Sequence, residues 1–198
     1  MRSTLIPFVL AATVMPRAGR AQAAAIPPVS EQMAAAVLPL PAEMHDGAMI
    51  MGYKVKDKLE TLRPGTNGMI CLALYVTRPD FHVACYHKGL EPFMARGREL
   101  RAQGVTGDKV DSVRFKEIAS GKLKMPRQGA LYTLTGTKAT WDPKRGKALG
   151  ASLLSVIYVP FATAAETGLS DRPQSSGPWL MLPGTAKAHI MLAEAMSP

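Results

Sequence analysis

The feature that most constrains the fold of this chain is a nearly continuous apolar run at residues 69–76 (MICLALYV), which directly follows a turn-forming segment at 63–68 (RPGTNG). The Pro-Gly and Asn-Gly pairs in that segment are strong turn signals. An apolar run without polar residues in alternation is typical of a strand that is buried on both faces. The sequence therefore predicts a strand in the interior of the protein at 69–76.

The chain has two cysteines, Cys71 and Cys85, with thirteen residues between them. In an oxidising compartment an even number of cysteines indicates a disulfide. A bridge over a loop of this size stabilises a fold by about 3 kcal/mol in the chain-entropy model. A reduced metal-binding or redox pair is the alternative, but the spacing differs from the C-x-x-C pattern. We therefore expect a structural disulfide between Cys71 and Cys85.

The N-terminal residues have the pattern of a secretion signal. After a short basic start, residues 5–15 (LIPFVLAATVM) form an apolar segment that is too short to span a bilayer, and residues 21–23 (AQA) fit the A-x-A cleavage pattern. The alternative is an ordinary N-terminal helix, which Pro7 would interrupt. The sequence thus predicts a signal peptide at 1–23, export to the periplasm or the cell exterior, and no membrane span in the mature protein.

Composition and charge limit the remaining possibilities. Hydrophobic residues make up 47% of the chain and charged residues 20%, which is typical of a globular protein rather than a disordered one. We expect an N-terminal connector with a short helix at 24–47 and a single domain at 48–198. The formal net charge of +9 favours weak binding to anionic envelope components. No run of basic residues stands out, so we expect no specific nucleic-acid partner.

The pattern of apolar residues and turn signals predicts mixed secondary structure. Helices are expected at 31–38, 91–103 and 109–120. Strands are expected at 48–53, 59–62, 69–76, 130–134, 153–159, 179–182 and 188–192, and a loop or irregular strand at 78–89. Because helices lie in the middle and strands on both sides, the order predicts an α+β domain with a largely antiparallel sheet, two or three short helices and one disulfide.

Two passages carry a resemblance to known proteins. Residues 63–71 (RPGTNGMIC) and 177–191 (GPWLMLPGTAKAHIM) are similar to passages in an uncharacterised family of exported bacterial proteins with no assigned activity. The resemblance implies a shared exported domain. It supplies no mechanism, and no functional residue is carried over from it.

Methionine and histidine residues raise the possibility of a soft-metal site at 44–51 (MHDGAMIM). Thioethers together with the imidazole of His45 suit Cu(I). However, Met49 and Met51 are two positions apart and share one face of a strand, where methionine is a normal core residue. Core packing is therefore the favoured interpretation of this segment.

A second metal candidate is the segment 81–87 (FHVACYH), which contains His82 and His87 and which His189 could approach from a distant strand. Oxidation of Cys85 would remove its thiolate as a ligand. The two histidines of the segment do not form an H-E-x-x-H pattern. We interpret all three as surface or hydrogen-bonded side chains, and we expect no metal and no other cofactor.

Known catalytic patterns are missing from the sequence. Neither G-x-S-x-G nor S-x-x-K occurs, and no glycine-rich segment matches a phosphate-binding loop. A Ser–His–Asp set assembled in space remains open. The basic residues Arg96, Arg98 and Arg101 of the helix predicted at 91–103 form a solvated face or, alternatively, meet phosphate or sulfate groups.

Three functional hypotheses follow from these observations. The leading one is a non-enzymatic exported domain with a binding or structural role in the periplasm or cell exterior. The second is an exported hydrolase whose polar residues converge only in three dimensions, and it requires a pocket that holds a histidine beside an acid or a hydroxyl. The third is a copper- or zinc-binding periplasmic protein that uses His45, His82, His87 or His189.

Overall fold

The computed structural model describes residues 25–74, 78–137, 140–174 and 176–193, so the signal peptide predicted at 1–23 lies outside the described residues. The strands are β1 (Met49–Val55), β2 (Lys58–Arg63), β3 (Met69–Leu72), β4 (Asp80–His87), β5 (Gly129–Thr137), β6 (Trp141–Asp142), β7 (Lys147–Ala148), β8 (Ser152–Tyr158), β9 (Gly177–Met181) and β10 (His189–Ala193). The helices are α1 (Val29–Ala36), η1 (Ala42–Met44), η2 (Lys88–Leu90), α2 (Glu91–Ala102), α3 (Asp108–Ala119) and α4 (Ala164–Thr167).

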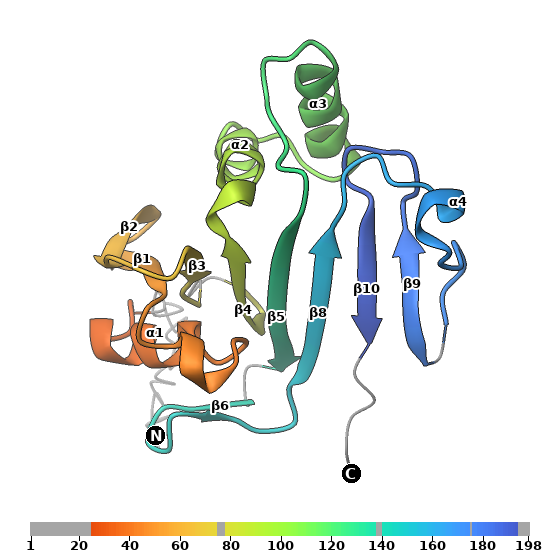
Figure 1. Ribbon diagram of the computed structural model, residues 1–198. Coiled ribbons are helices and arrows are strands. Elements are labelled where there is room, and N and C mark those ends of the chain that lie inside the picture. The colour runs from red at the N-terminus through yellow and green to blue at the C-terminus, as the bar shows by residue number, and fades with distance from the viewer. Residues whose placement is uncertain (1–24, 75–77, 138–139, 175, 194–198) are drawn as a thin grey trace, which may run out of the picture.

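Eight of these strands form one sheet in the order β2-β1-β3-β4-β5-β8-β10-β9, and β6 and β7 form a separate hairpin (Figure 1). Neighbouring strands of the sheet are antiparallel except β1 and β3, which are parallel. The predicted α+β class with a largely antiparallel sheet is therefore confirmed. In the described part of the chain, α1, α2 and α3 are the helices of eight residues or more, as the prediction of two or three short helices requires.

The apolar run forms strand β3, which lies between β1 and β4 in the sheet. Its first three residues are buried, as expected for a strand that is covered on both faces. The strand ends at Leu72 and is thus shorter than the prediction of 69–76, of which residues 75 and 76 lie outside the described residues.

The structure corrects the interpretation of residues 78–89 as a loop or irregular strand. β4 is a regular strand of eight residues that pairs with β3 on one side and with β5 on the other. Its alternate residues Phe81, Val83 and Cys85 are buried, which is the period-2 pattern of a strand. Arg78, Pro79 and Asp80 precede this pattern and obscure it in the sequence.

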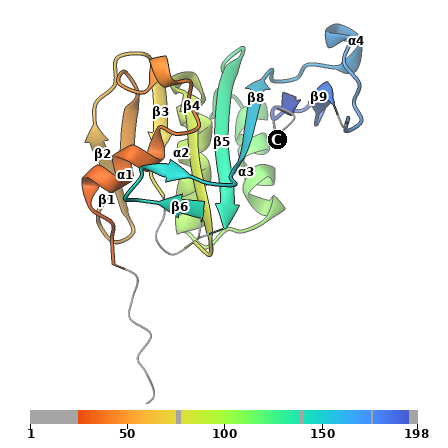
Figure 2. The ribbon, with the colours of Figure 1, turned by 90° about the horizontal axis from the view of Figure 1, so that it is seen from below.

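The two faces of the sheet are covered by different elements (Figure 2). α1 and the β6–β7 hairpin pack on the face that carries Cys71, Phe81 and Cys85, which we call the disulfide face. α2 and α3 cover the opposite face, which carries Tyr86 and Tyr158 and which we call the α2–α3 face. The disulfide face therefore has two hydrophobic clusters, one around the disulfide and one around Phe81, and the α2–α3 face has a third.

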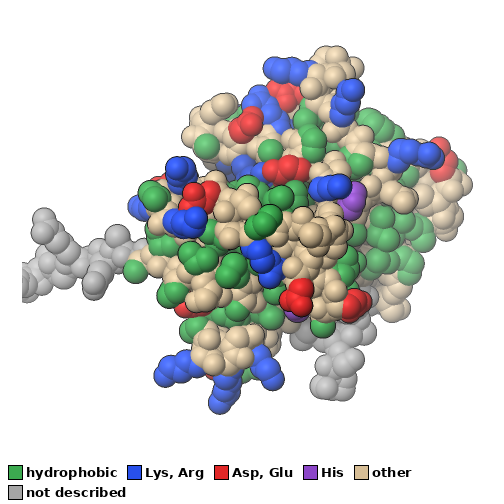
Figure 3. Space-filling view, turned by 60° about the vertical axis from the view of Figure 1, so that its left-hand side comes forward, with side chains coloured by type: hydrophobic (Ala, Val, Ile, Leu, Met, Phe, Trp, Pro, Cys, Tyr) green, Lys and Arg blue, Asp and Glu red, His purple; other side chains and the backbone are tan. Residues whose placement is uncertain are grey.

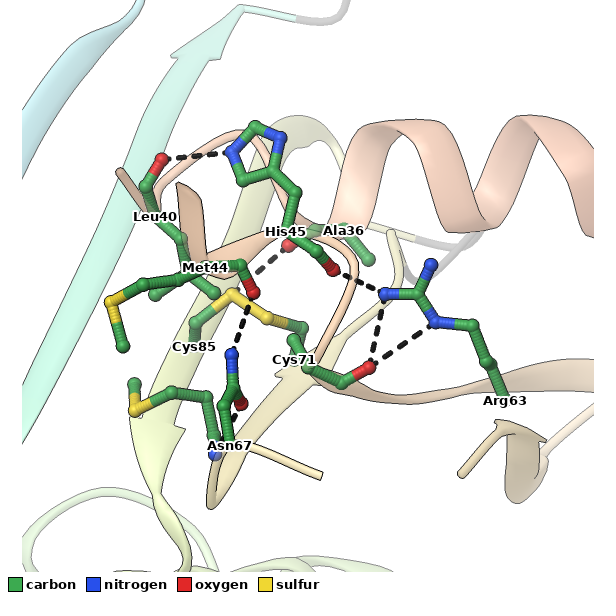
Figure 4. Close-up of a disulfide and its surroundings, with 10 residues drawn as sticks. Ala36, Leu40, Met44, His45, Arg63, Asn67, Cys71 and Cys85 are labelled. Carbon is green, nitrogen blue, oxygen red and sulfur yellow. Dashed lines mark hydrogen bonds between the residues drawn. A yellow bond between two sulfur atoms is a disulfide. The ribbon is translucent and has the colours of Figure 1, made fainter. Parts of the chain in front are cut away.

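On the disulfide face, Cys71 and Cys85 are opposite each other on β3 and β4 and form the predicted disulfide, with an S–S distance of 2.07 Å (Figure 4). Cys85 Sγ lies 3.1 Å from the carbonyl oxygen of Ala36, which is a packing contact because an oxidised sulfur has no hydrogen to donate. The guanidinium of Arg63 donates hydrogen bonds to the carbonyl oxygens of His45 and Ala48.

Helix α1 is joined to the sheet by one buried polar side chain. The helix predicted at 31–38 is present as α1, two residues closer to the N-terminus, and Pro28 occupies its N-cap. Gln32 is 2% exposed. Its Nε2 donates to the carbonyl oxygen of Tyr53 at 2.7 Å, and its Oε1 accepts from the N–H of Tyr53 at 2.8 Å.

The α2–α3 face is built from two helices of twelve residues each. α2, at the place predicted for the helix 91–103, has a proline in its first turn and buries Phe93, Gly97 and Leu100. α3 buries Val110 together with the charged Arg114. Over the described residues, no helix combines the length and apolar character that a membrane crossing requires.

Candidate functional site

A hollow of about 250 Å³ opens between α2 and the α2–α3 face of the sheet. Its apolar lining includes Leu72, Phe93, Met94 and Leu131. Among the described residues that line it, none carries a carboxylate. The basic side chains in its lining are His82, Arg98, Arg101, Arg114 and Lys187. Hollows lined by charge of one sign concentrate ligands of the opposite sign.

Two neighbouring hollows extend this site along α2. Their volumes are about 340 and 750 Å³, and both are lined by Arg78 and Tyr53. Arg101 lines all three hollows, so they adjoin one another at this side chain. We refer to the three together as the cleft.

The innermost basic group of the cleft is Arg114, which is 4% exposed. Its Nη1 donates to the carbonyl oxygen of Phe93 at 3.1 Å, and its guanidinium carbon lies 3.7 Å from the centre of the Phe93 ring, a cation–π contact. Its Nη2 donates to Asp111. Among the described residues, no group accepts a hydrogen bond from its buried Nε.

Asp111 accepts hydrogen bonds from two cations, Arg114 and Lys187, and Lys187 Nζ donates to it at 2.8 Å. Burial raises the pKa of Asp111, but the hydrogen bonds from Lys187 and Arg114 outweigh burial and hold the pKa below its usual value. The carboxylate is therefore ionised at neutral pH. One negative charge shared by two positive charges leaves this end of the cleft with a positive surplus.

A second polar network lies beside the first. The hydroxyl of Tyr86 donates to Glu91 Oε2 at 2.5 Å, and Arg98 donates to the Tyr86 oxygen at 2.9 Å and to Glu91 Oε1 at 2.6 Å. Burial and the hydrogen bond to Glu91 raise the pKa of Tyr86 far above its usual value. The hydroxyl therefore keeps its proton at neutral pH, and Glu91 neutralises the charge of Arg98.

The three arginines predicted to share a helix face, Arg96, Arg98 and Arg101, have different surroundings in the structure. Arg96 donates to Glu117 on α3 at 2.7 Å and joins the two helices. Arg98 is half-buried and hydrogen-bonded, so it does not belong to a solvated face. Arg101 alone of the three is exposed and forms no ion pair with a described residue.

His82 is the candidate histidine that reaches the cleft. Its Nδ1 lies 3.0 Å from the hydroxyl of Thr135, so the structure contains the pocket with a histidine beside a hydroxyl that the hydrolase hypothesis requires. Burial, followed by the positive charge of Arg78, lowers the pKa of His82. No described carboxylate accepts a hydrogen bond from the other ring nitrogen, so the third group that would orient a general base is not supplied by the described residues.

The other three candidate histidines lie elsewhere. His45 Nε2 is 2.9 Å from the carbonyl oxygen of Leu40, and His87 accepts a hydrogen bond from the N–H of Gly89 at 3.2 Å. His189 Nδ1 is 2.7 Å from the carbonyl oxygen of Lys187. The structure therefore does not bring the four histidines together, and the described residues contain no group of three His, Cys, Asp or Glu placed to hold a metal ion.

The methionines of the 44–51 segment are divided between the two faces of the sheet. Met44 packs against the cluster around the disulfide, whereas Met49 and Met51 pack against the cluster of the α2–α3 face. The structure thus agrees with the interpretation of Met49 and Met51 as core residues on one face of a strand.

Basic side chains are spread over the surface outside the cleft. Figure 3 shows Lys and Arg at several separate places on the visible face, with Asp and Glu among them. This distribution matches the sequence, in which basic residues occur without a run. The hollow of about 250 Å³ is therefore distinguished by its lining and not by the overall charge.

No family model, no curated protein and no solved structure matches this chain. Function is therefore inferred from the geometry of the cleft. Two of its basic residues, Arg98 and Arg101, were sequence candidates for meeting phosphate or sulfate groups. Arg114 and Lys187 were missed. The one available signal was the i,i+4 spacing of Arg114 from the buried Val110, which places both on the inward face of α3.

Proposed function

We propose that this chain is an exported, non-enzymatic binding domain whose ligand is an anion held in the cleft between α2 and the sheet. The observation that carries the proposal is the lining of the inner hollow, which has five basic side chains and no carboxylate among the described residues. Apolar walls with a few convergent polar groups are typical of small-molecule sites. The ligand is accordingly a small organic anion.

Export is supported by two independent features of the chain. The signal-peptide pattern at 1–23 directs a protein out of the cytoplasm. The Cys71–Cys85 disulfide is the kind of bond that persists in oxidising compartments. The ligand is therefore a component of the periplasm or the cell exterior.

The protonation states of the cleft favour binding over turnover. Arginine keeps its proton at all physiological pH values, and the raised pKa of Tyr86 keeps that hydroxyl protonated as well. General acid–base catalysis requires a group whose pKa lies near the working pH. His82 is the one group of the inner lining that can act as a base near neutral pH, and a lone His–Thr contact does not complete a catalytic set.

The proposal is tested by calorimetric titration of the full chain, expressed with its leader, with three ligands of similar size: benzoate, benzamide and benzylamine. We expect benzoate to bind and the neutral and cationic ligands to bind at least tenfold more weakly. Arg101→Gln should weaken benzoate binding. Arg127→Gln, at an exposed arginine that lines none of the three hollows, is the matched control and should leave it unchanged.

Equal binding of all three ligands, or no binding of benzoate and of other small organic anions, would overturn the anion site. Turnover in a screen of ester, glycoside and peptide substrates would overturn the non-enzymatic part of the proposal. The two outcomes are independent, because the first measures affinity and the second measures chemistry.

A further inference from the structure

Two arginines from different helices converge over Gly97, in the middle of α2. A Cβ atom on Gly97 would lie 2.9 Å from Arg114 Nη1 and 3.2 Å from Arg101 Nη1. The two cationic nitrogens are therefore at most about 6 Å apart, a distance at which like charges repel. Glycine is less favourable than alanine inside a helix, and here the missing side chain leaves room for both guanidinium groups.

The charges around this pair do not balance. Arg114 and Lys187 share the single carboxylate of Asp111. Arg101 forms no ion pair with any described residue. The inner hollow therefore has a surplus of two positive charges. In addition, the Nε of Arg114 is a buried donor without an acceptor among the described residues. Buried donors and charges are costly unless a partner satisfies them.

A phosphate monoester matches this surplus better than other anions. Its phosphate carries close to two negative charges at pH 7 and offers three acceptor oxygens, whereas a carboxylate or a sulfate ester carries one charge. Guanidinium groups bind phosphate oxygens with two parallel hydrogen bonds each. Two guanidinium groups at this separation can therefore both contact one phosphate.

We propose that the cleft binds the phosphate of a phosphate monoester between Arg101 and Arg114, with the apolar body of the ligand against Met94 and Leu131. This inference rests on the proposed function, since it names the chemistry of the anion. Both apolar side chains line the inner hollow together with the two arginines. A soluble phosphate monoester and the headgroup of a phosphorylated lipid share this chemistry.

The test is a calorimetric titration of the full chain at pH 7.5 with phenyl phosphate, phenyl sulfate and benzoate. Phenyl phosphate is expected to bind at least tenfold more tightly than the other two, and inorganic phosphate should compete with it. Arg101→Gln should weaken phenyl phosphate binding at least tenfold. Gly97→Ala should do the same, because its Cβ occupies the space of the two guanidinium groups. Arg127→Gln is again the control.

The outcomes separate this inference from the proposed function. Similar affinity for the three anions would overturn the phosphate inference and leave the anion-binding proposal intact, while no binding of any anion would overturn both. Unchanged affinity in Arg101→Gln would also overturn the inference. That variant keeps the test decisive if Gly97→Ala does not fold, because Arg101 is exposed.

Sedimentation with lipid vesicles identifies the source of the phosphate. Vesicles that contain phosphatidic acid present a phosphate monoester, and vesicles that contain phosphatidylglycerol at equal charge present a diester. Binding to the former alone supports a lipid headgroup, and binding of phenyl phosphate without binding to either vesicle supports a soluble ligand. Equal binding to both vesicles, with loss of neither in Arg101→Gln, would overturn the inference.

Discussion

The two faces of the sheet differ in whether their buried polar groups have hydrogen-bond partners. On the disulfide face, the buried Gln32 exchanges hydrogen bonds with main-chain atoms of Tyr53, and Arg63 donates to main-chain carbonyl oxygens. On the α2–α3 face, Arg114 is buried with its Nε lacking an acceptor in the described part of the chain, and it shares one carboxylate with Lys187.

This difference indicates that the disulfide face contributes mainly to stability and the α2–α3 face mainly to binding. Hydrogen-bonded polar groups and a disulfide stabilise a fold, whereas buried charges in excess cost free energy. Proteins depart from full satisfaction of buried polar groups mainly at functional sites. We therefore expect changes on the disulfide face to lower stability without altering the cleft, and changes on the α2–α3 face to affect both.

Reduction of the Cys71–Cys85 disulfide should give the largest loss of stability. The bond joins residues 14 positions apart, and loss of this constraint on the unfolded chain should lower the free energy of unfolding by about 3 kcal/mol. Urea unfolding with and without reductant measures the effect, and the variant C71A/C85A should not respond to reductant. A urea midpoint that is unchanged after complete reduction would contradict this prediction, and benzoate affinity should be the same in both redox states.

Gln32→Leu should have the next largest effect, a loss of about 2 kcal/mol of unfolding free energy, because it removes hydrogen bonds inside the protein without removing their main-chain partners. Ala34→Gln, at an exposed position of the same helix, is the matched control and should change stability little. Urea unfolding of both variants gives the comparison. A loss of cleft affinity in folded Gln32→Leu would show that the two faces are not separable.

Local signals in the sequence were sufficient for much of the fold. The turn residues before Met69 and the apolar run after it placed β3, and the pattern of apolar residues and turn signals placed α2. The cysteine pair was predicted from number and compartment. These features depend on residues close together in the chain, so one sequence contains the information for them.

The site depended on contacts that local signals do not report. Arg114 meets Asp111 three positions away, but Lys187 meets the same carboxylate from 76 positions away. The burial of a charged residue in α3 follows from how α3 packs against Phe93 of α2. β4 was likewise not predicted as a regular strand. Its regularity depends on pairing with β3, which precedes it in the sequence, and with β5, which follows it.

Asp111→Asn tests the ion network of the α2–α3 face. We expect a loss of about 1.5 kcal/mol of unfolding free energy at pH 7, less than for a fully buried pair because the side chain of Asp111 is 28% exposed. The pKa of Asp111 is lower in the folded protein than in the unfolded chain, so its stabilisation is present above the ordinary Asp pKa and is lost as pH falls through the folded value.

The difference between wild type and Asp111→Asn in urea unfolding should therefore be smaller at pH 3 than at pH 7. Asp80→Asn is the control, because Asp80 pairs with the exposed Arg78 and such pairs contribute little. An equal difference at the two pH values would show that Asp111 does not stabilise the fold through its charge.

The smallest expected effect comes from His82 and His189, which both lie on the α2–α3 face. Burial, the largest cause for each, lowers their pKa values below that of an unfolded histidine. As pH falls from 7 to 5, the unfolded chain takes up protons before the folded protein does, so the free energy of unfolding decreases. Urea unfolding of His82→Gln and His189→Gln should show a weaker dependence on pH than the wild type over this range. If all three proteins lose stability equally between pH 7 and 5, the pH sensitivity does not come from these side chains.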